Sequence, residues 1–348
     1  MNDRTQYQRR VSQERVQCLL CPHMCRLREG QRGACGVRIN QGGEVRSLNY
    51  GRVTSIALDP TEKKPLYHFH PGSYLLSLGS LGCSMSCGFC QNWEISQGEA
   101  PAREITPDEV VTLLDRSRPQ AVGVAYTYSE PLMWYEFVLA AAEAVRRAGY
   151  VNVLVTNGFI NPEPLAELLK FTDALNVDLK ALRDDFYRRI CRGRLDPVLR
   201  AVEMAKEAGC HVEVTNLLIP GLNDSDEDIH SLVDWVADLD PSIPLHFSRY
   251  YPGYRMNRPP TPVDTLKRAR DLALQRLSYV YIGNAPQAGG SDTHCPSCGV
   301  TLIERSGYDV EVTPYLAEGR CRVCGADIEI ITEVGEGGEE NHCNSPGG

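Results

Sequence analysis

The grouping of the cysteines constrains this chain more than any other feature of its sequence. Fourteen of the 348 residues are cysteine, and eleven of these fall into three groups. In chain order the groups are CLLCPHMC with GACG, then GCSMSCGFC, then CPSCG with CRVCG. A chain of this length can build a core without disulfides, so cysteines grouped in this way indicate metal binding. One group near each end and one between them predict three modules.

The last group predicts a closed metal site with four ligands. Cys295 and Cys298 form one C-x2-C pair, and Cys321 and Cys324 form the second, each pair being followed by glycine. Four thiolates around one ion leave no coordination position free, so we expect zinc in a structural role, in the manner of a zinc ribbon. Iron of the rubredoxin type would use the same ligands and is the alternative.

The middle group differs because it has only three members. Cys83, Cys87 and Cys90 form C-x3-C-x2-C, with no fourth cysteine close to them in the sequence. Most [4Fe–4S] clusters take four thiolates, so three would leave one iron free to bind another molecule. The alternative is a zinc ion with a histidine as its fourth ligand, and His68 and His70 precede this loop.

The N-terminal group also offers four thiolates, from Cys18, Cys21, Cys25 and Cys35. Its spacing fits zinc or a second iron–sulfur cluster, and His23 lies within the group as a substitute ligand. A structural metal is the default interpretation. A second cluster would be able to relay an electron.

Residues 73–284 alternate short apolar runs with amphipathic helical stretches. The expected strands are SYLLSLGSLG, AVGVAYTY, VNVLVTN, DALNVDL, HVEVTNLLI, PLHFSRY and YVYIGN. Their apolar and β-branched character is typical of strands buried on both faces of a parallel sheet. Helix starts lie between them, as in the capping box that Thr106 and Glu109 form. Repeated βα units of this size predict a full or partial barrel.

Polar residues lie at the carboxyl ends of several expected strands, or within them. In barrels of this kind that end carries the site, so we expect these side chains to meet the middle cysteine group there. The residues are Glu130, Asn157, Asp178, Lys180 and His246. Taken singly, the first four have simpler interpretations, such as a helix cap, a turn residue or a surface ion pair. Their common position favours one shared site.

The middle cysteine motif, with Phe89 before its last cysteine, resembles the cluster-binding motif of the radical S-adenosylmethionine (SAM) superfamily. The resemblance implies a [4Fe–4S] cluster whose open iron binds the amino and carboxylate groups of SAM. One electron from the cluster would cleave SAM to methionine and a 5′-deoxyadenosyl radical, which abstracts hydrogen from a substrate. An electron donor of the flavodoxin or ferredoxin type is implied as well.

Within that superfamily, the strand order and the SEP motif around Glu130 are similar to the pyruvate formate-lyase activating-enzyme branch. The resemblance implies that Glu130 contacts the SAM amino group. It places Asp178 and Lys180 in the DLK motif near SAM and His246 on the ribose side. The activating enzymes hold a monovalent cation with an aspartate before Thr-Asn-Gly. Here Val155 stands at that position, so a cation site is not expected.

From end to end the chain is similar to the radical SAM member of the AmmeMemoRadiSam system. The matching segments include CLLCPHMC, CQNWEIS, YTYSEP, NVDLKA, HFSRYYP and CPSCGVTLIERSGY. This implies an α/β fold, a partial TIM-type (βα)6 radical SAM barrel with small Cys-rich metal-binding modules at both termini, acting with partner proteins. The resemblance does not identify the substrate. The alternatives are an activase that installs a glycyl radical on a protein substrate, and a non-catalytic metal-binding adaptor.

We expect four segments along the chain. They are a four-Cys module at 1–50, the barrel at 51–290, a zinc-ribbon-like module at 291–334 and a disordered tail at 335–348 that contains Cys343. Cys191 and Cys210 are expected to be small buried residues. Because arginines follow Cys191, a catalytic thiol is a second interpretation there.

Charge and hydropathy narrow the function further. The formal charge of −9 argues against a general nucleic-acid binder, which usually carries a basic face. The polar N-terminus lacks the apolar segment of a signal peptide, and no apolar run reaches membrane length. We therefore expect a cytoplasmic enzyme without membrane contact, in a reducing compartment where an open-iron cluster survives.

Overall fold

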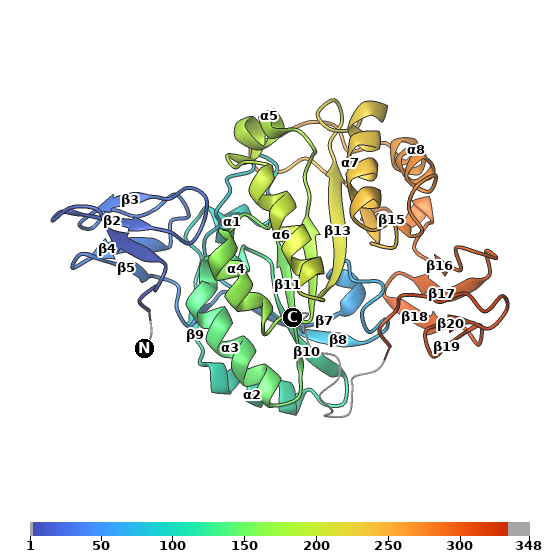
Figure 1. Cartoon of the computed structure of the whole chain (residues 1–348), viewed down its shortest axis with the longest axis horizontal. Coiled ribbons are helices and arrows are strands. Elements are labelled where there is room, and N and C mark those ends of the chain that lie inside the picture. The colour runs from blue at the N-terminus through green and yellow to red at the C-terminus, as the bar shows by residue number, and fades with distance from the viewer. Residues whose placement is uncertain (1–2, 333–348) are drawn as a thin grey trace, which may run out of the picture.

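The computed structural model describes residues 3–332, and its centre is an eight-stranded sheet (Figure 1). The strand order is β15-β14-β13-β12-β11-β10-β8-β7. Its parallel strands coincide with the predicted runs and are β8 (Tyr74–Gly79), β10 (Ala121–Tyr126), β11 (Val151–Thr156), β12 (Ala174–Asp178), β13 (His211–Leu218), β14 (Leu245–Arg249) and β15 (Val280–Gly283). At one edge β7 (Ser55–Pro60) runs antiparallel to β8. The parallel strands follow in chain order, as in a barrel wall, without the reversal of a doubly wound sheet.

A helix lies between each pair of successive parallel strands, which gives six βα units and a last strand. The connecting helices are α2 (Pro107–Arg116), α3 (Tyr135–Arg147), α4 (Pro162–Leu169), α6 (Asp196–Glu207), α7 (Asp226–Leu239) and α8 (Val263–Ala273). The capping box at the start of α2 is formed, because the Thr106 amide donates to the Glu109 carboxylate at 2.7 Å and the Glu109 amide donates to the Thr106 hydroxyl at 3.2 Å. The α/β fold with six βα units is therefore confirmed.

Side chains alternate between the two faces of the sheet, and this decides what points into the barrel. Ala125, Val153 and Ala174 are paired across neighbouring strands and belong to a small apolar cluster separate from the core that the helices cover. Asn176 and Asp178 follow Ala174 at intervals of two residues, so they lie on the same inner face, nearer the carboxyl end of β12. The barrel interior thus changes from an apolar floor to a polar mouth.

The N-terminal part forms a small β module, drawn in blue at the left of Figure 1. It consists of β1 (Gln8–Arg10), β2 (Arg15–Cys18) and β3 (Arg26–Arg28) in one sheet, with β4 (Arg38–Gln41) and β5 (Glu44–Ser47) as a hairpin. A further short pair, β6 (Arg52–Val53) with β9 (Arg103–Glu104), leads from the module into the barrel.

The C-terminal part is a second β module, at the right of Figure 1. Its strands are β16 (Thr293–His294), β17 (Thr301–Ser306), β18 (Asp309–Val312), β19 (Leu316–Ala317) and β20 (Arg320–Cys321). Arg305 on β17 joins the module to the barrel: its buried guanidinium lies 3.5 Å from the Glu62 carboxylate, donates to the Tyr67 carbonyl at 2.7 Å and stacks on the Tyr67 ring.

Two sequence expectations fall outside these elements. The tail predicted at 335–348, with Cys343, lies outside the described residues. Within residues 3–332, no helix combines the length and the apolar character needed to span a membrane.

Candidate active site

The middle cysteine group lies on the loop that follows β8, at the carboxyl end of the sheet. The Cys83 thiol accepts hydrogen bonds from the Met85 amide and from the side-chain amide of Asn157, both at 3.4 Å. Cys90 contacts the hydroxyl of Ser96 at 3.3 Å. The loop after β8 and the loop after β11 therefore meet at Asn157.

Glu130 joins the second and third strand ends. Its buried carboxylate accepts from the Thr156 hydroxyl at 2.6 Å, the Asn157 amide at 2.9 Å and the Leu132 amide at 3.1 Å. The last of these bonds caps the short helix η2 (Pro131–Trp134). Burial raises the pKa of the Glu130 carboxyl to about 7. Glu130 is thus a helix cap, as the simpler interpretation held, and also a carboxylate fixed beside Asn157.

Lys180 and Asp178 form an ion pair at 3.1 Å at the end of β12. The Lys180 side chain is only 12% exposed, whereas that of Asp178 is 43% exposed. The Lys180 ammonium lies 5.7 Å from the centre of the Phe89 ring, and its charge contributes to lowering the pKa of the Cys87 thiol. The lysine therefore reaches inward to the cysteine loop, which a surface ion pair would not do.

His246 is level with Asp178 in the register of the sheet, but its side chain makes different contacts from those of the other predicted residues. A ring nitrogen is 2.6 Å from the Glu213 carboxylate, and the ring packs edge-on against Tyr67. Within residues 3–332 its recorded contacts do not include Glu130 or Lys180. Across the sheet, Thr215 stands in register between Asp178 and His246, and its buried hydroxyl has no hydrogen-bond partner among the described residues. A polar ligand between Asp178 and His246 would satisfy that hydroxyl.

His68 does not complete a zinc site with the three cysteines. One of its ring nitrogens is 2.6 Å from the Tyr281 hydroxyl and the other is 2.9 Å from the Glu329 carbonyl. His70 is likewise buried, with its backbone amide bonded to Ile331. No histidine joins Cys83, Cys87 and Cys90 in a ligand group within residues 3–332. The zinc site that would have used these histidines is therefore not supported by the geometry.

Besides Thr215, the structure brings Cys191 next to the cysteine loop, where the sequence pattern did not place it. The Cys191 carbonyl accepts from the Ser86 amide at 2.8 Å, and the neighbouring Cys191 thiol lowers the pKa of the Cys87 thiol. Cys191 is fully buried. The two cysteines lie far apart in the chain, so spacing gave no signal. The only hint was the basic sequence after Cys191.

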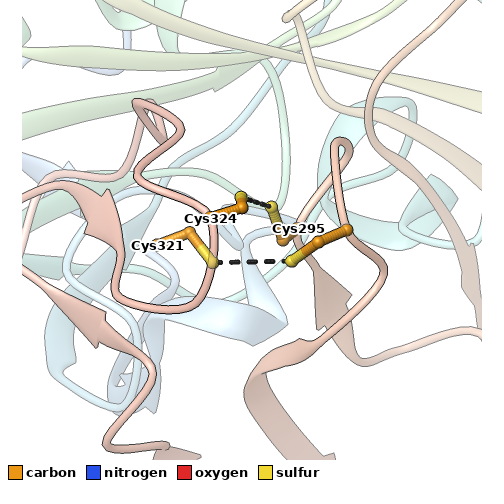
Figure 2. A group of neighbouring side chains, drawn as sticks. Cys295, Cys321 and Cys324 are labelled. Atoms are coloured by element: carbon orange, nitrogen blue, oxygen red, sulfur yellow. Dashed lines mark hydrogen bonds between the residues drawn. The ribbon is translucent and has the colours of Figure 1, made fainter.

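The C-terminal cysteines are gathered as a single ion requires (Figure 2). The Cys295 and Cys324 sulfurs are 3.5 Å apart, and those of Cys298 and Cys321 are 3.7 Å apart. Zinc–sulfur bonds of about 2.3 Å in a tetrahedron place sulfurs about 3.8 Å apart, so the four thiols fit one ion. Figure 2 shows Cys321 and Cys324 facing Cys295 across the site.

The N-terminal cysteines are near neighbours but are not gathered in that way. Among the described residues, the C-terminal group is the only set of three or more ligand atoms within 4.8 Å of one another, so the middle cysteines are not gathered around a single ion either. Cys18, Cys21 and Cys35 are buried, and burial raises the pKa of each thiol. The positive charge of Arg38 opposes that rise at Cys18 and Cys35. The Nε of Arg38 is buried and has no partner among the described residues.

Comparisons with known proteins agree with this geometry. A family model described as the radical SAM superfamily matches residues 78–236. An uncharacterized protein, MJ0808 of Methanocaldococcus jannaschii, is 43% identical over 329 residues, which are 92% of this chain and 97% of that protein. The pyruvate formate-lyase 1-activating enzyme of Escherichia coli K12 is 28% identical over 163 residues, which are 45% of this chain and 66% of that enzyme.

A solved structure shows a similar fold. The crystal structure of Streptococcus suis SuiB bound to precursor peptide SuiA superimposes with a TM-score of 0.50 at 18% identity, over 63% of this chain and 50% of that one.

Proposed function

This chain belongs to the radical SAM superfamily, and on that premise we propose that it is an enzyme that cleaves SAM reductively and abstracts hydrogen from a substrate. A [4Fe–4S] cluster would supply the electron that cleaves SAM. Cys83, Cys87 and Cys90 would hold it, since all three lie on one loop at the carboxyl end of the sheet. The substrate is unidentified, and we infer that partner proteins of the AmmeMemoRadiSam type take part.

The observation that carries this proposal is the meeting of three strand-end loops around the cysteines. Asn157 contacts both the Cys83 thiol and Glu130, and the ammonium of Lys180, from a third strand, lies 5.7 Å from the centre of the Phe89 ring on the cysteine loop. The set offers amide, carboxylate and ammonium groups within one small region. These are the partners that the amino and carboxylate groups of SAM require, placed next to the thiols that would hold the cluster.

Each residue has a separate task in this proposal. Glu130 would accept a hydrogen bond from the SAM amino group, with its carboxylate already oriented by three donors. Lys180 would neutralise the SAM carboxylate. Asp178, Thr215 and His246 stand in one register line across β12, β13 and β14, and they would bind the ribose. The orphaned hydroxyl of Thr215 adds this residue to the predicted set.

Formation of 5′-deoxyadenosine tests the proposal directly. Protein reconstituted with iron and sulfide without oxygen, then given dithionite and SAM, is expected to release 5′-deoxyadenosine. Cys87→Ala should abolish the product, because the variant retains too few thiolates to hold the cluster. Cys210→Ala is the matched control, since Cys210 is also buried but donates to the Thr172 carbonyl. Absence of product from wild-type protein with its full iron content would contradict the proposal.

A second candidate function is activation of a glycyl-radical enzyme. It rests on the 28% identity to the E. coli activating enzyme over 163 residues. In this case the substrate would be a protein backbone, and the electron would come from a donor of the flavodoxin or ferredoxin type. A SAM-dependent glycyl-radical signal in a partner enzyme, detected by electron paramagnetic resonance (EPR), is the expected observation.

We propose that the C-terminal cysteines bind zinc as a structural ion. The sulfur separations of 3.5 and 3.7 Å support a single tetrahedral ion, and the four thiolates leave no position for a substrate.

We also propose a metal at the N-terminal group, in contact with the catalytic loop. A side-chain atom on Gly82 would lie 2.8 Å from the Cys35 carbonyl, so the two segments touch. A ring nitrogen of His23 is 2.7 Å from the Ser84 carbonyl. Metal-bound thiolates at Cys18 and Cys35 would also give the unpartnered Nε of Arg38 an acceptor.

Metal analysis of a Cys18→Ala, Cys21→Ala double variant tests this site. We expect the variant to lose metal that the wild type retains. Loss of about four irons per chain would support a second cluster that relays electrons, because the module contacts the catalytic loop. Loss of one zinc would support a structural site. Unchanged iron would exclude the relay, and unchanged iron and zinc together would exclude the site.

A further inference from the structure

A hollow lined by arginines lies where the N-terminal module meets the segment that follows β12. Its volume is about 430 Å³, and we call it the arginine hollow. None of its described lining residues is acidic, and all three of its arginines are exposed. The lining includes Pro22, His23, Arg188, Arg192, Gly193 and Arg194. Because the whole chain carries a formal charge of −9, three clustered positive charges make this place unlike the average surface.

The guanidinium groups of the arginine hollow are available to a ligand. Within residues 3–332, Arg192 has no hydrogen-bond or ion-pair partner. Arg194 donates through one nitrogen to the Pro22 carbonyl at 2.8 Å, which holds its side chain across the junction of the two parts. Arg188 is paired with Asp184, but the two side chains remain 63% and 40% exposed. Guanidinium groups in such positions suit carboxylates, which they bind through two parallel hydrogen bonds.

Both sides of the arginine hollow are bonded to the loop that carries the middle cysteines. On the barrel side, the π-helix η3 (Tyr187–Cys191) contains Arg188, and the Cys191 carbonyl accepts from the Ser86 amide at 2.8 Å. On the side of the N-terminal module, a ring nitrogen of His23 is 2.7 Å from the Ser84 carbonyl. The hollow is therefore fixed to the catalytic loop by contacts that do not involve its arginines.

A single layer of residues separates the arginine hollow from the catalytic loop. A side-chain carbon at Gly193, in the lining, would lie 3.2 Å from the terminal carbon of Met85. Met85 is 2% exposed and lies between Cys83 and Cys87 in the sequence. The rate of electron transfer falls steeply with distance, so this is a short route from the surface to the thiols.

We propose that the arginine hollow is the docking site of an acidic one-electron donor protein. This rests on the proposed function, since it requires a cluster to reduce. In the step, one electron leaves the donor, which is oxidised, and enters the cluster, which is reduced; no bond breaks and no proton moves. The mouth of the barrel is closed to the donor, because SAM and the substrate would occupy it.

Charge complementarity is the reason for an acidic partner. A chain of formal charge −9 repels an acidic protein on average, so productive encounters need a local positive surface next to the site of reduction. Complementary charges of this kind raise the rate of encounter and set the orientation of the partner. The arginine hollow provides the positive charge, the recess and the short route together.

A second hollow in the N-terminal module provides a matched control. It has a volume of about 520 Å³ and is lined by Arg15, Arg26 and Arg28 of β2 and β3, together with Glu29. Among the described residues, no hydrogen bond joins its lining to residues 83–90. It therefore offers similar positive charge without a route to the catalytic loop.

Binding of a flavodoxin to the reconstituted protein provides the test, because it needs no SAM and no turnover. An Arg188→Gln, Arg192→Gln double variant should bind the flavodoxin about tenfold more weakly at low salt, as measured by calorimetry, because it loses the steering charges. Reduction of its cluster by reduced flavodoxin, followed by stopped-flow absorbance, should slow by a similar factor. Added salt should weaken binding more in wild type than in this variant. An Arg26→Gln, Arg28→Gln variant should behave as wild type.

Dithionite and a charge-conserving variant guard against misfolding. With dithionite as the electron source, the Arg188→Gln, Arg192→Gln variant should form 5′-deoxyadenosine as wild type does, because dithionite needs no docking site. An Arg188→Lys, Arg192→Lys variant keeps the charge and should retain most of the affinity. A carbodiimide should link flavodoxin carboxylates to position 188 or 192 of that variant, which locates the partner directly.

The outcomes separate the docking proposal from the proposed function. If neither an acidic flavodoxin nor an acidic ferredoxin binds, or if the glutamine variant at 188 and 192 binds as wild type does, the docking proposal is wrong. Loss of binding in the Arg26→Gln, Arg28→Gln variant alone would also overturn it, because the donor would then use the other hollow. In each of these cases product formed with dithionite leaves the proposed function standing. Absence of that product from wild type with its full iron content is the failure of the proposed function itself.

Discussion

At the scale of single residues, buried polar groups determine what this site can bind. Glu130 accepts three hydrogen bonds within the protein, and Asn157 both donates to a cysteine sulfur and contacts that carboxylate. Such groups lose little freedom when a ligand arrives, because their neighbours already fix them. The orphaned hydroxyl of Thr215 is the exception, and it lies where a ligand is still required.

The burial of His70 predicts how the free energy of unfolding depends on pH. Burial lowers the pKa of its imidazole to about 4, below the value of about 6.5 for an exposed histidine. Between these values the unfolded chain binds a proton that the folded chain does not. The free energy of unfolding should therefore fall as the pH drops from 6.5 towards 4, by at most about 3 kcal/mol from this residue.

Urea unfolding of wild type and His70→Asn between pH 5 and 7.5 checks that prediction. The free energy of unfolding of the variant should change less with pH over this range than that of the wild type. Replacement of His230, which is exposed on α7, is the control and should leave the wild-type slope. If the free energy of unfolding changes equally with pH in wild type and His70→Asn, then His70 does not cause the loss of stability at low pH.

At the scale of elements, one close approach fixes the N-terminal module against the catalytic loop. Gly82 has φ of 87°, and a side-chain carbon there would lie 2.7 Å from both methyl carbons of Val37. The backbone of the cysteine loop therefore fits against the module only because this residue lacks a side chain. The contact lies one residue before Cys83, so the position of the first thiol depends on it.

Gly82→Ala should destabilise the protein more than Gly149→Ala does. Both glycines have positive φ, but nothing lies within 4 Å of a side-chain carbon at Gly149. The Gly149 variant should cost roughly 1 kcal/mol of unfolding free energy from backbone strain alone. The Gly82 variant should cost a further 1–3 kcal/mol, approximately, from overpacking. The difference in unfolding free energy between the two variants is measured from their urea midpoints, provided that the m-values are unchanged. Equal losses in the two variants would mean that Gly82 is not packed tightly against Val37.

At the scale of the whole molecule, the sequence predicted those features of the fold that depend on residues close together in the chain, such as the strands of the central sheet. Each parallel strand was recognisable because residues such as those in VNVLVTN are apolar and β-branched, as buried parallel strands require. The meeting of Asn157 and Glu130 followed from the rule that strand carboxyl ends share one edge. Neither inference needed knowledge of distant contacts.

What escaped prediction depends on contacts between distant segments. Cys191 approaches Cys87 only because a π-helix after β12 is bonded to the loop after β8. Thr215 became recognisable only once its register against Asp178 and His246 was known. No spacing rule links positions that lie on different strands or turns, so the folded chain was needed to find them.

The attachment of the C-terminal module has a consequence for how the protein is made. Arg305 and Ile331 bond to residues around Tyr67 and His68, at the floor of the barrel. During synthesis those partners leave the ribosome more than two hundred residues apart. The floor can therefore close only after the segment that reaches Ile331 has left the ribosome. Iron–sulfur assembly factors that need a closed barrel would then act only once that segment has emerged, rather than on the strands alone.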